Sequence, residues 1–159
     1  PTADSAAVYH KIKNPFWDEK INAMRGRFGT KALDMKDVLR FMMKTPNDGE
    51  TAYLFVADQS PKKSAIHYYI NFLHQNTPVF NGFDKIAQRK NMGVVYCQTE
   101  KRKRGHYHTT FIRIKPQNEK FEENEIVHQF FDLLEKNIQQ HPSNWLWSHK
   151  RWKYADLQK

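Results

Sequence analysis

The chain of 159 residues contains one cysteine, Cys97, so an internal disulfide is impossible. Its longest apolar run, 52–57, has the length of a buried strand and falls far short of the roughly 18 residues that cross a bilayer. No cationic and apolar signal segment opens the sequence. These absences exclude a disulfide scaffold and a membrane span within these residues, and they predict a cytosolic, reducing location.

Motifs of several enzyme classes are also absent. The sequence has no phosphate-cradling glycine-rich loop, no Gly-x-Ser-x-Gly elbow and no paired cysteine spacing. Cys97 follows the apolar run 94–96 without a local activating group, so we expect an inert core thiol. His106 and His108 could offer two metal ligands from one strand face, but no third ligand stands at a recognisable spacing. We therefore expect neither a cofactor nor a bound metal.

The chain has an excess of positive charge. It carries 26 Lys and Arg against 17 Asp and Glu, a formal net charge of +9 at pH 7. Such a charge favours anionic partners, and nucleic acid, an anionic membrane carrying phosphorylated glycolipid and an acidic carrier protein all stay open. With 39% apolar residues, the chain can form one domain with a core, which we place at 1–159.

The first half of the sequence alternates strand and helix patterns. We predict a strand at 6–11, a helix at 15–27 capped by Asn14, and a second helix at 35–44. The run 51–57 is apolar on both faces, the pattern of a central strand with helices on both sides. One face of the first helix is apolar and should pack on a sheet; its residues are Trp17, Ile21, Met24 and Phe28.

The second half predicts a different order of elements. We expect a long ordered loop at 60–80, a helix at 82–90, and a hairpin of strands 93–98 and 107–114 across the basic turn 101–105. An amphipathic helix follows, with apolar residues at Ile126, Phe130, Leu133, Leu134 and Ile138. The predicted fold class is α/β, with a mainly parallel sheet, flanking helices and a carboxyl-terminal antiparallel hairpin.

Asp58 and Gln59 follow the strand 51–57, at the strand end where open α/β sheets collect ligands. The carboxylate of Asp58 could instead cap the following turn or pair with an arginine. If the partner is Arg25 or Arg27, the guanidinium would be fixed with its other N–H donors directed at a phosphate. Taken by themselves, two arginines near a helix end would be solvated charges that interact with the last carbonyls of the helix.

Two lysines and a basic run could also bind anions. Lys62 and Lys63 follow the same strand and could contact a phosphate, or they could be ordinary surface lysines. The run could dock on a membrane or a carrier protein, or it could form a solvated turn. It consists of Lys101, Arg102, Lys103 and Arg104.

The segment 145–154 mixes aromatic rings with cations. This mixture suits the headgroup region of an anionic membrane, because Trp and Tyr settle where apolar surface meets water and cations attract phosphate. It equally suits a helix end that folds back on the body of the protein, since large aromatic side chains are usually mostly buried. The candidate docking residues are Trp145, Trp147, Arg151 and Trp152.

Four sequence blocks support a resemblance. They are RGRFG at 25–29, VADQ at 56–59, FLHQNTPVFNG at 72–82 and W-x-W-x-H-x-R-W at 145–152. In order and spacing they resemble the bacterial lipid A biosynthesis acyltransferases, the lauroyl and myristoyl transferases of the lysophospholipid acyltransferase superfamily. The resemblance spans nearly the whole chain. It implies that Arg25 and Arg27 bind substrate and that no nucleotide or metal takes part.

The chain departs from that family at its catalytic signature, a His followed after four residues by Asp or Glu. None of the eight His residues has an acid at that position. The resemblance places this block, and a membrane-anchoring helix, ahead of the segment that begins near Ala6. We therefore expect the carboxyl-terminal part of a longer enzyme, with which the first residue, Pro1, agrees. Alone it should be inactive, and apolar surface that the missing part would cover should make it self-associate.

The resemblance implies a specific reaction. The longer enzyme would transfer a fatty acyl group from acyl carrier protein to a hydroxyl of a lipid A precursor, at the cytoplasmic face of the bacterial inner membrane. Two alternatives stay open: a noncatalytic superfamily member that docks lipid or carrier, and a basic nucleic-acid-binding module. The second lacks any recognisable reader motif or zinc site, so we expect no nucleic-acid partner.

Overall fold

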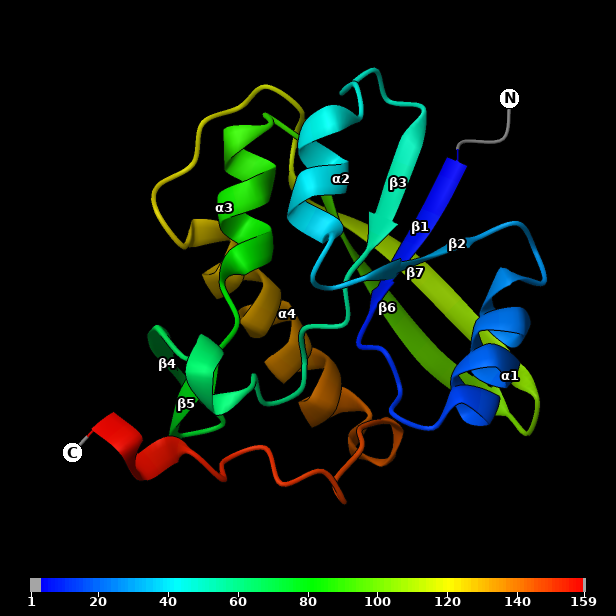
Figure 1. The fold of residues 1–159 in the computed structure, drawn as a ribbon. Coiled ribbons are helices and arrows are strands. Elements are labelled where there is room, and N and C mark those ends of the chain that lie inside the picture. The colour runs from blue at the N-terminus through cyan, green and yellow to red at the C-terminus, as the bar shows by residue number, and fades with distance from the viewer. Residues whose placement is uncertain (1–3, 159) are drawn as a thin grey trace. The chain divides into compact units, whose positions relative to one another are not determined.

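The computed structural model describes residues 4–158 and confirms the predicted mixed α/β class (Figure 1). The chain divides into two compact units, of which the first ends at Val56 and the second begins at Ala57. The single domain predicted for 1–159 stays a prediction.

The first unit is built on a three-stranded parallel sheet in the order β2-β1-β3. Its strands are β1 (Asp4–Tyr9), β2 (Lys31–Asp34) and β3 (Thr51–Leu54), and Ala7 of β1 is in register with Ala32 on one side and Leu54 on the other. The helices α1 (Pro15–Gly26) and α2 (Val38–Lys44) connect them.

The central strand of this sheet is β1, which corrects the prediction that 51–57 would be central. Ala6 and Val8 of β1 are buried, whereas β3 pairs with β1 alone among the described strands and its Leu54 is exposed. An edge strand can be as apolar as a central one, so composition could not separate them. The short β2 was not predicted, because four residues are too few for a periodic pattern to emerge.

Helix α1 begins as predicted. The Asn14 side-chain oxygen accepts hydrogen bonds from the backbone N–H groups of Phe16 (3.0 Å) and Trp17 (3.3 Å), and a proline occupies the first helical turn. Most of the apolar face predicted to pack on the sheet is instead exposed, with Phe28 88% accessible, whereas Ile21 is half-buried. The helix contacts β2, and Asn22 donates to the Tyr9 hydroxyl at 3.1 Å, so a different side of α1 faces the sheet.

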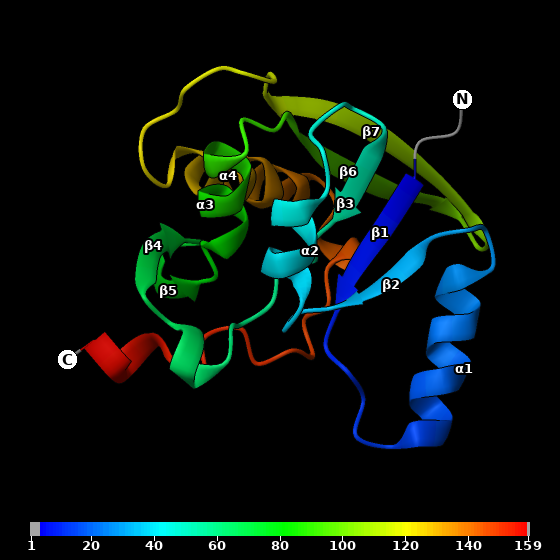
Figure 2. The same cartoon turned by 45° about the horizontal axis from the view of Figure 1, so that its top comes forward.

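The second unit is organised by α4 (Glu125–Gln140), which contacts the hairpin strands β4 (Tyr68–Phe72), β6 (Val94–Lys103) and β7 (His106–Lys115), and also α3 (Gly82–Arg89). Figure 2 shows α3 in front of α4. The buried Asp84 side chain accepts the Val127 N–H at 3.1 Å, which satisfies a donor in the first turn of α4. The helix buries Ile126, Val127, Phe131, Leu134 and Ile138.

The region predicted as a long loop at 60–80 is ordered into secondary structure. It contains a 3₁₀ turn (Lys63–Ala65) and an antiparallel hairpin of β4 with β5 (Gln75–Val79). The hairpin turn holds Leu73 and His74 at positive φ, 48° and 59°. Turns of this kind normally carry Asn or Gly, so Leu-His gave no sequence signal for the hairpin.

The predicted β6–β7 hairpin is confirmed, with longer strands and a tighter turn. Lys101 to Lys103 belong to β6, and only Arg104 and Gly105 form the turn, where Gly105 has a φ of 78°. The prediction of a core thiol at Cys97 was wrong, because Cys97 is exposed. A two-stranded hairpin that packs one face on a helix leaves every second residue on its other face.

Candidate functional site

The segment 145–154 packs against the second unit, so the folded-back alternative is confirmed for two of its tryptophans. The ring of Trp152 stacks on Phe72 at 6.4 Å between centroids, and its indole N–H donates to the Thr77 hydroxyl at 2.8 Å. Trp145 meets Phe72 edge to face at 6.0 Å. Trp147 remains 55% exposed although its indole N–H donates to the Pro142 carbonyl.

Arg151 lies in the interior, with 1% of its surface accessible. Its Nη1 donates to the Pro78 carbonyl at 2.8 Å, and its guanidinium lies 5.6 Å from the centre of the Phe131 ring. Nε and Nη2 have no hydrogen-bond partner among the described residues. Arg151 is therefore not a surface cation, which corrects the docking role predicted for it.

The negative charge of Asp58 affects the pKa of this buried cation. Burial lowers the pKa of Arg151 to about 10, and the negative charge of Asp58 opposes that shift. Burial likewise raises the pKa of the Tyr96 phenol, a hydrogen bond from Asn137 lowers it, and Asp58 raises it. Asp58 thus sits, half-buried, within electrostatic reach of Arg151 and Tyr96.

Ser60 ties the segment after Asp58 to the carboxyl-terminal block. Its backbone N–H donates to Nε2 of His149 at 3.0 Å, and its hydroxyl donates to the carbonyl of Arg151. Because Nε2 accepts a hydrogen bond here, we assign the neutral-ring proton to Nδ1. His149 therefore uses Nε2 to hold a turn, and Nε2 is the nitrogen that would have to accept a proton if His149 were a general base.

Two of the four sequence blocks consequently contact each other in the second unit, and Ser60, the residue after a third block, joins them. The block 145–152 contacts 72–82 through Arg151 and Trp152, and it contacts the segment after 56–59 through Ser60. The sequence indicated these blocks but not the residues that join them. Ser60, Thr77 and Pro78 carry no pattern that marks them as partners, because side-chain partners distant in sequence follow from tertiary packing alone.

Arg25 and Arg27 belong to the first unit, at the end of α1. Each guanidinium lies over an aromatic ring at 5.6 Å from its centre, Arg25 over Tyr9 and Arg27 over Phe28. Both side chains are exposed, and within residues 4–158 neither forms an ion pair. Stacking on a ring holds a guanidinium plane while leaving its N–H groups free for an anion.

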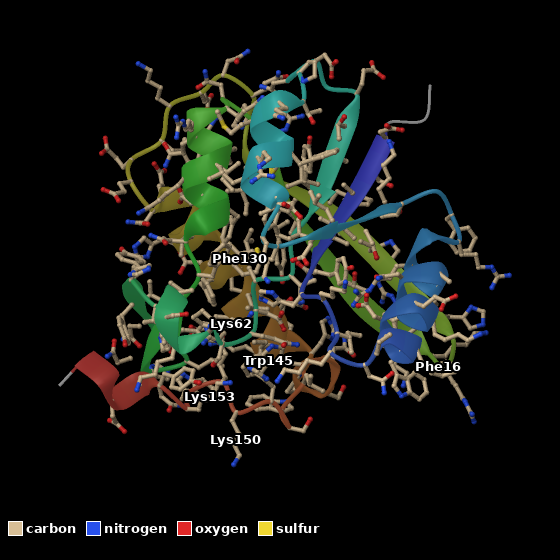
Figure 3. All side chains as sticks on the ribbon, in the orientation of Figure 1. Phe16, Lys62, Phe130, Trp145, Lys150 and Lys153 are labelled. Atoms are coloured by element: carbon tan, nitrogen blue, oxygen red, sulfur yellow. The ribbon has the colours of Figure 1, made fainter. Side chains whose placement is uncertain are left out.

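The remaining candidates lie at the surface. Gln59, Lys62 and Lys63 are exposed, and Figure 3 shows Lys62 together with Lys150, whose side chain extends away from the ribbon. The basic run Lys101 to Arg104 is also exposed, with Arg102 3.1 Å from Glu100. The binding roles of all these residues stay predictions.

No helix among residues 4–158 is long and apolar enough to cross a membrane. In the same part of the chain, no group of three or more His, Cys, Asp or Glu side chains is placed to hold a metal ion.

The fold and the joined blocks are consistent with part of an acyltransferase domain, a mixed α/β arrangement with a parallel sheet and antiparallel hairpins. Comparison with family models extends this likeness over residues 2–154, which match the model described as bacterial lipid A biosynthesis acyltransferase. The chain belongs to that family. A search of curated proteins found no match.

Proposed function

We propose that the protein to which this chain belongs transfers a fatty acyl group from acyl carrier protein to a hydroxyl of a lipid A precursor, at the cytoplasmic face of the bacterial inner membrane. The observation that carries the proposal is the family match over residues 2–154. It is supported by the contacts of the block 145–152 with the block 72–82 and with Ser60, the residue after the block 56–59.

In this proposal the first unit binds the phosphorylated end of the acceptor. Arg25 and Arg27 are exposed, stacked on aromatic rings and unpaired within the described residues, which suits bidentate binding of phosphate. In the second unit, Asp58 contributes negative charge that reaches the buried Arg151. Within the second unit, Lys62 and Lys63 are exposed cations, which by itself suits phosphate binding there.

Chemistry in this proposal requires a His with an acidic residue five positions further on, a pair that none of the eight His residues provides. That His would remove the proton of the acceptor hydroxyl, and the resulting alkoxide would attack the thioester carbonyl and release the carrier thiol. General-base catalysis contributes on the order of 10²–10⁴ in rate, so binding groups alone should not sustain turnover.

The test is an acyl-transfer assay with acyl carrier protein and a lipid A precursor, with the acylated product measured by mass spectrometry. We expect no product above the protein-free blank from this chain alone. If the purified chain formed product at an appreciable rate, the proposal that the catalytic His and its acidic partner are not among these 159 residues would be refuted.

A further inference from the structure

The β6–β7 hairpin has an outer face that α4 does not cover. Opposite residues of an antiparallel pair point to the same side, and the four outward pairs run from the base to the tip. They are Val95 with Arg113, Cys97 with Phe111, Thr99 with Thr109, and Lys101 with Tyr107. All eight side chains are exposed, and the two threonine hydroxyls lie 3.0 Å apart. We call these eight residues the hairpin outer face.

The inner face of the same hairpin is occupied by packing and pairing. Tyr96 is buried and meets Phe130 of α4 edge to face at 5.5 Å between centroids. Glu100 pairs with Arg102 at 3.1 Å and lies 3.4 Å from the His141 ring nitrogen. The position of the hairpin on α4 is therefore fixed from the inner side, and the outer face is not required for that packing.

Charge on the hairpin has one sign. The residues 94–115 contain five exposed cations, and their single carboxylate is Glu100, which points to the inner side. The cations are Lys101, Arg102, Lys103, Arg104 and Arg113. Lys101 and Arg113 belong to the hairpin outer face, and Arg102 is paired with Glu100; the exposed cations as a set make the hairpin complementary to an anionic partner.

Apolar side chains lie between these cations. Phe111 is 72% exposed, Tyr107 is 65% exposed and Val95 is 50% exposed. Large side chains so exposed favour a partner with an apolar layer, and Tyr beside Lys is the pairing that suits the boundary between headgroups and acyl chains. An acidic protein would also match the cations, but Tyr107 directly opposite Lys101, with Phe111 on the same face, favours a lipid surface.

We propose that the hairpin outer face binds an anionic lipid surface, with Phe111 and Tyr107 entering the headgroup layer and the cations contacting lipid phosphates. The inference rests on the proposed function in one respect: the acceptor lipid of that reaction would itself lie in an anionic lipid surface. It replaces Arg151 and Trp152 as docking residues, because those side chains are engaged inside the second unit.

The test is cosedimentation of the full chain with vesicles of phosphatidylcholine, with and without phosphatidylglycerol. We expect binding only to the anionic vesicles, weakening as salt rises. Phe111→Ser should weaken binding about ten-fold or more, as expected for the loss of one inserted aromatic ring. Lys101→Glu should weaken it at least about five-fold.

Matched controls come from elsewhere in the chain. Phe16, 58% exposed on α1, controls for loss of an exposed phenyl ring in Phe16→Ser. Lys136, exposed on α4, controls for charge reversal in Lys136→Glu. All four substitutions are at exposed positions, and circular dichroism will verify that each variant is folded.

Cys97 supplies an independent readout, since it is the single cysteine of the chain and lies opposite Phe111 on the outer face. A fluorophore attached there should become shielded from aqueous iodide when anionic vesicles are added. The proposal would be overturned if vesicle binding left the label accessible to iodide. It would also be overturned if the two control substitutions weakened binding as much as Phe111→Ser and Lys101→Glu do.

Two further results would also overturn it. One is Phe111-dependent binding of an acidic carrier protein or of nucleic acid without vesicle binding, and the other is Phe111-dependent dimerisation without vesicle binding. Because none of these measurements requires acyl transfer, failure of the membrane surface is distinguishable from failure of the proposed function.

Discussion

Replacing Arg151 tests whether a buried arginine stabilises the second unit by its charge or by its volume. Its hydrogen bond to the Pro78 carbonyl, made by a charged donor at 2.8 Å, contributes about 1.5–3 kcal/mol. The contact with Phe131 adds about 0.5–2 kcal/mol. Against these stands the burial of the cation, because a pKa lowered from 12.5 to about 10 corresponds to about 3 kcal/mol.

These contributions nearly cancel, so the size of the replacement should decide the outcome. We expect Arg151→Met, which fills most of the space, to change the free energy of unfolding by less than about 1.5 kcal/mol. Arg151→Ala also leaves a cavity and should cost about 3 kcal/mol. Arg113→Ala, at an exposed position, is the control and should cost less than about 0.5 kcal/mol.

Urea unfolding followed by tryptophan fluorescence measures these differences, because Trp145, Trp147 and Trp152 lie in the second unit close to Arg151 in sequence. If Arg151→Met cost as much as Arg151→Ala, the charge itself would be required, and Asp58→Asn should then show a comparable loss. If Arg151→Ala cost less than about 1 kcal/mol, our account of how the carboxyl-terminal block is anchored would be wrong.

Three smaller predictions concern single side chains. Asn14→Ala should lower stability of the first unit by about 1 kcal/mol through loss of the α1 cap, measured as a lower urea midpoint by circular dichroism; an unchanged midpoint would show that the cap contributes nothing. Asp84→Ala should cost about 2 kcal/mol, since it leaves the buried Val127 N–H without its acceptor, whereas Asp132→Ala on the exposed side of α4 should cost far less. The Cys97 side chain is exposed, but partial desolvation raises the pKa of its thiol. Its reaction with an aromatic disulfide should therefore go to completion in the folded protein, with a pH dependence displaced upward from that of a free thiol; a thiol that reacts only after unfolding would contradict its exposure.

The parts of the fold predicted from sequence are those with strong local signals. Asn14 and Pro15 fixed the start of α1, and the apolar spacing of Ile126, Leu134 and Ile138 located α4. The β4–β5 hairpin escaped detection because its turn uses Leu73 and His74 in a conformation normally marked by Asn or Gly. Such a turn is held by its surroundings, and a single sequence does not display them.

For the candidate site too, the sequence predicted what a local signal marks and missed what depends on distant contacts. The sequence indicated Asp58 and the block that contains Arg151, because both stand in recognisable surroundings. One alternative from the sequence paired Asp58 with Arg25 or Arg27, while within the second unit the charge of Asp58 reaches the buried Arg151 and opposes the lowering of its pKa. The sequence also predicted a solvent-facing or lipid-facing Arg151, since burial of an arginine depends on a distant carbonyl, that of Pro78.

The most direct test of the proposed function is the affinity of this chain for a phosphorylated lipid A precursor in detergent micelles, measured by isothermal titration calorimetry. Our account predicts saturable binding that falls about ten-fold or more in the Arg25→Ala, Arg27→Ala double variant, because two charge-assisted contacts to phosphate are removed. Arg40→Ala, another exposed arginine of the first unit, should leave the affinity unchanged. Equal affinity of the wild type and the double variant, or equal affinity for a precursor without phosphate, would contradict the account.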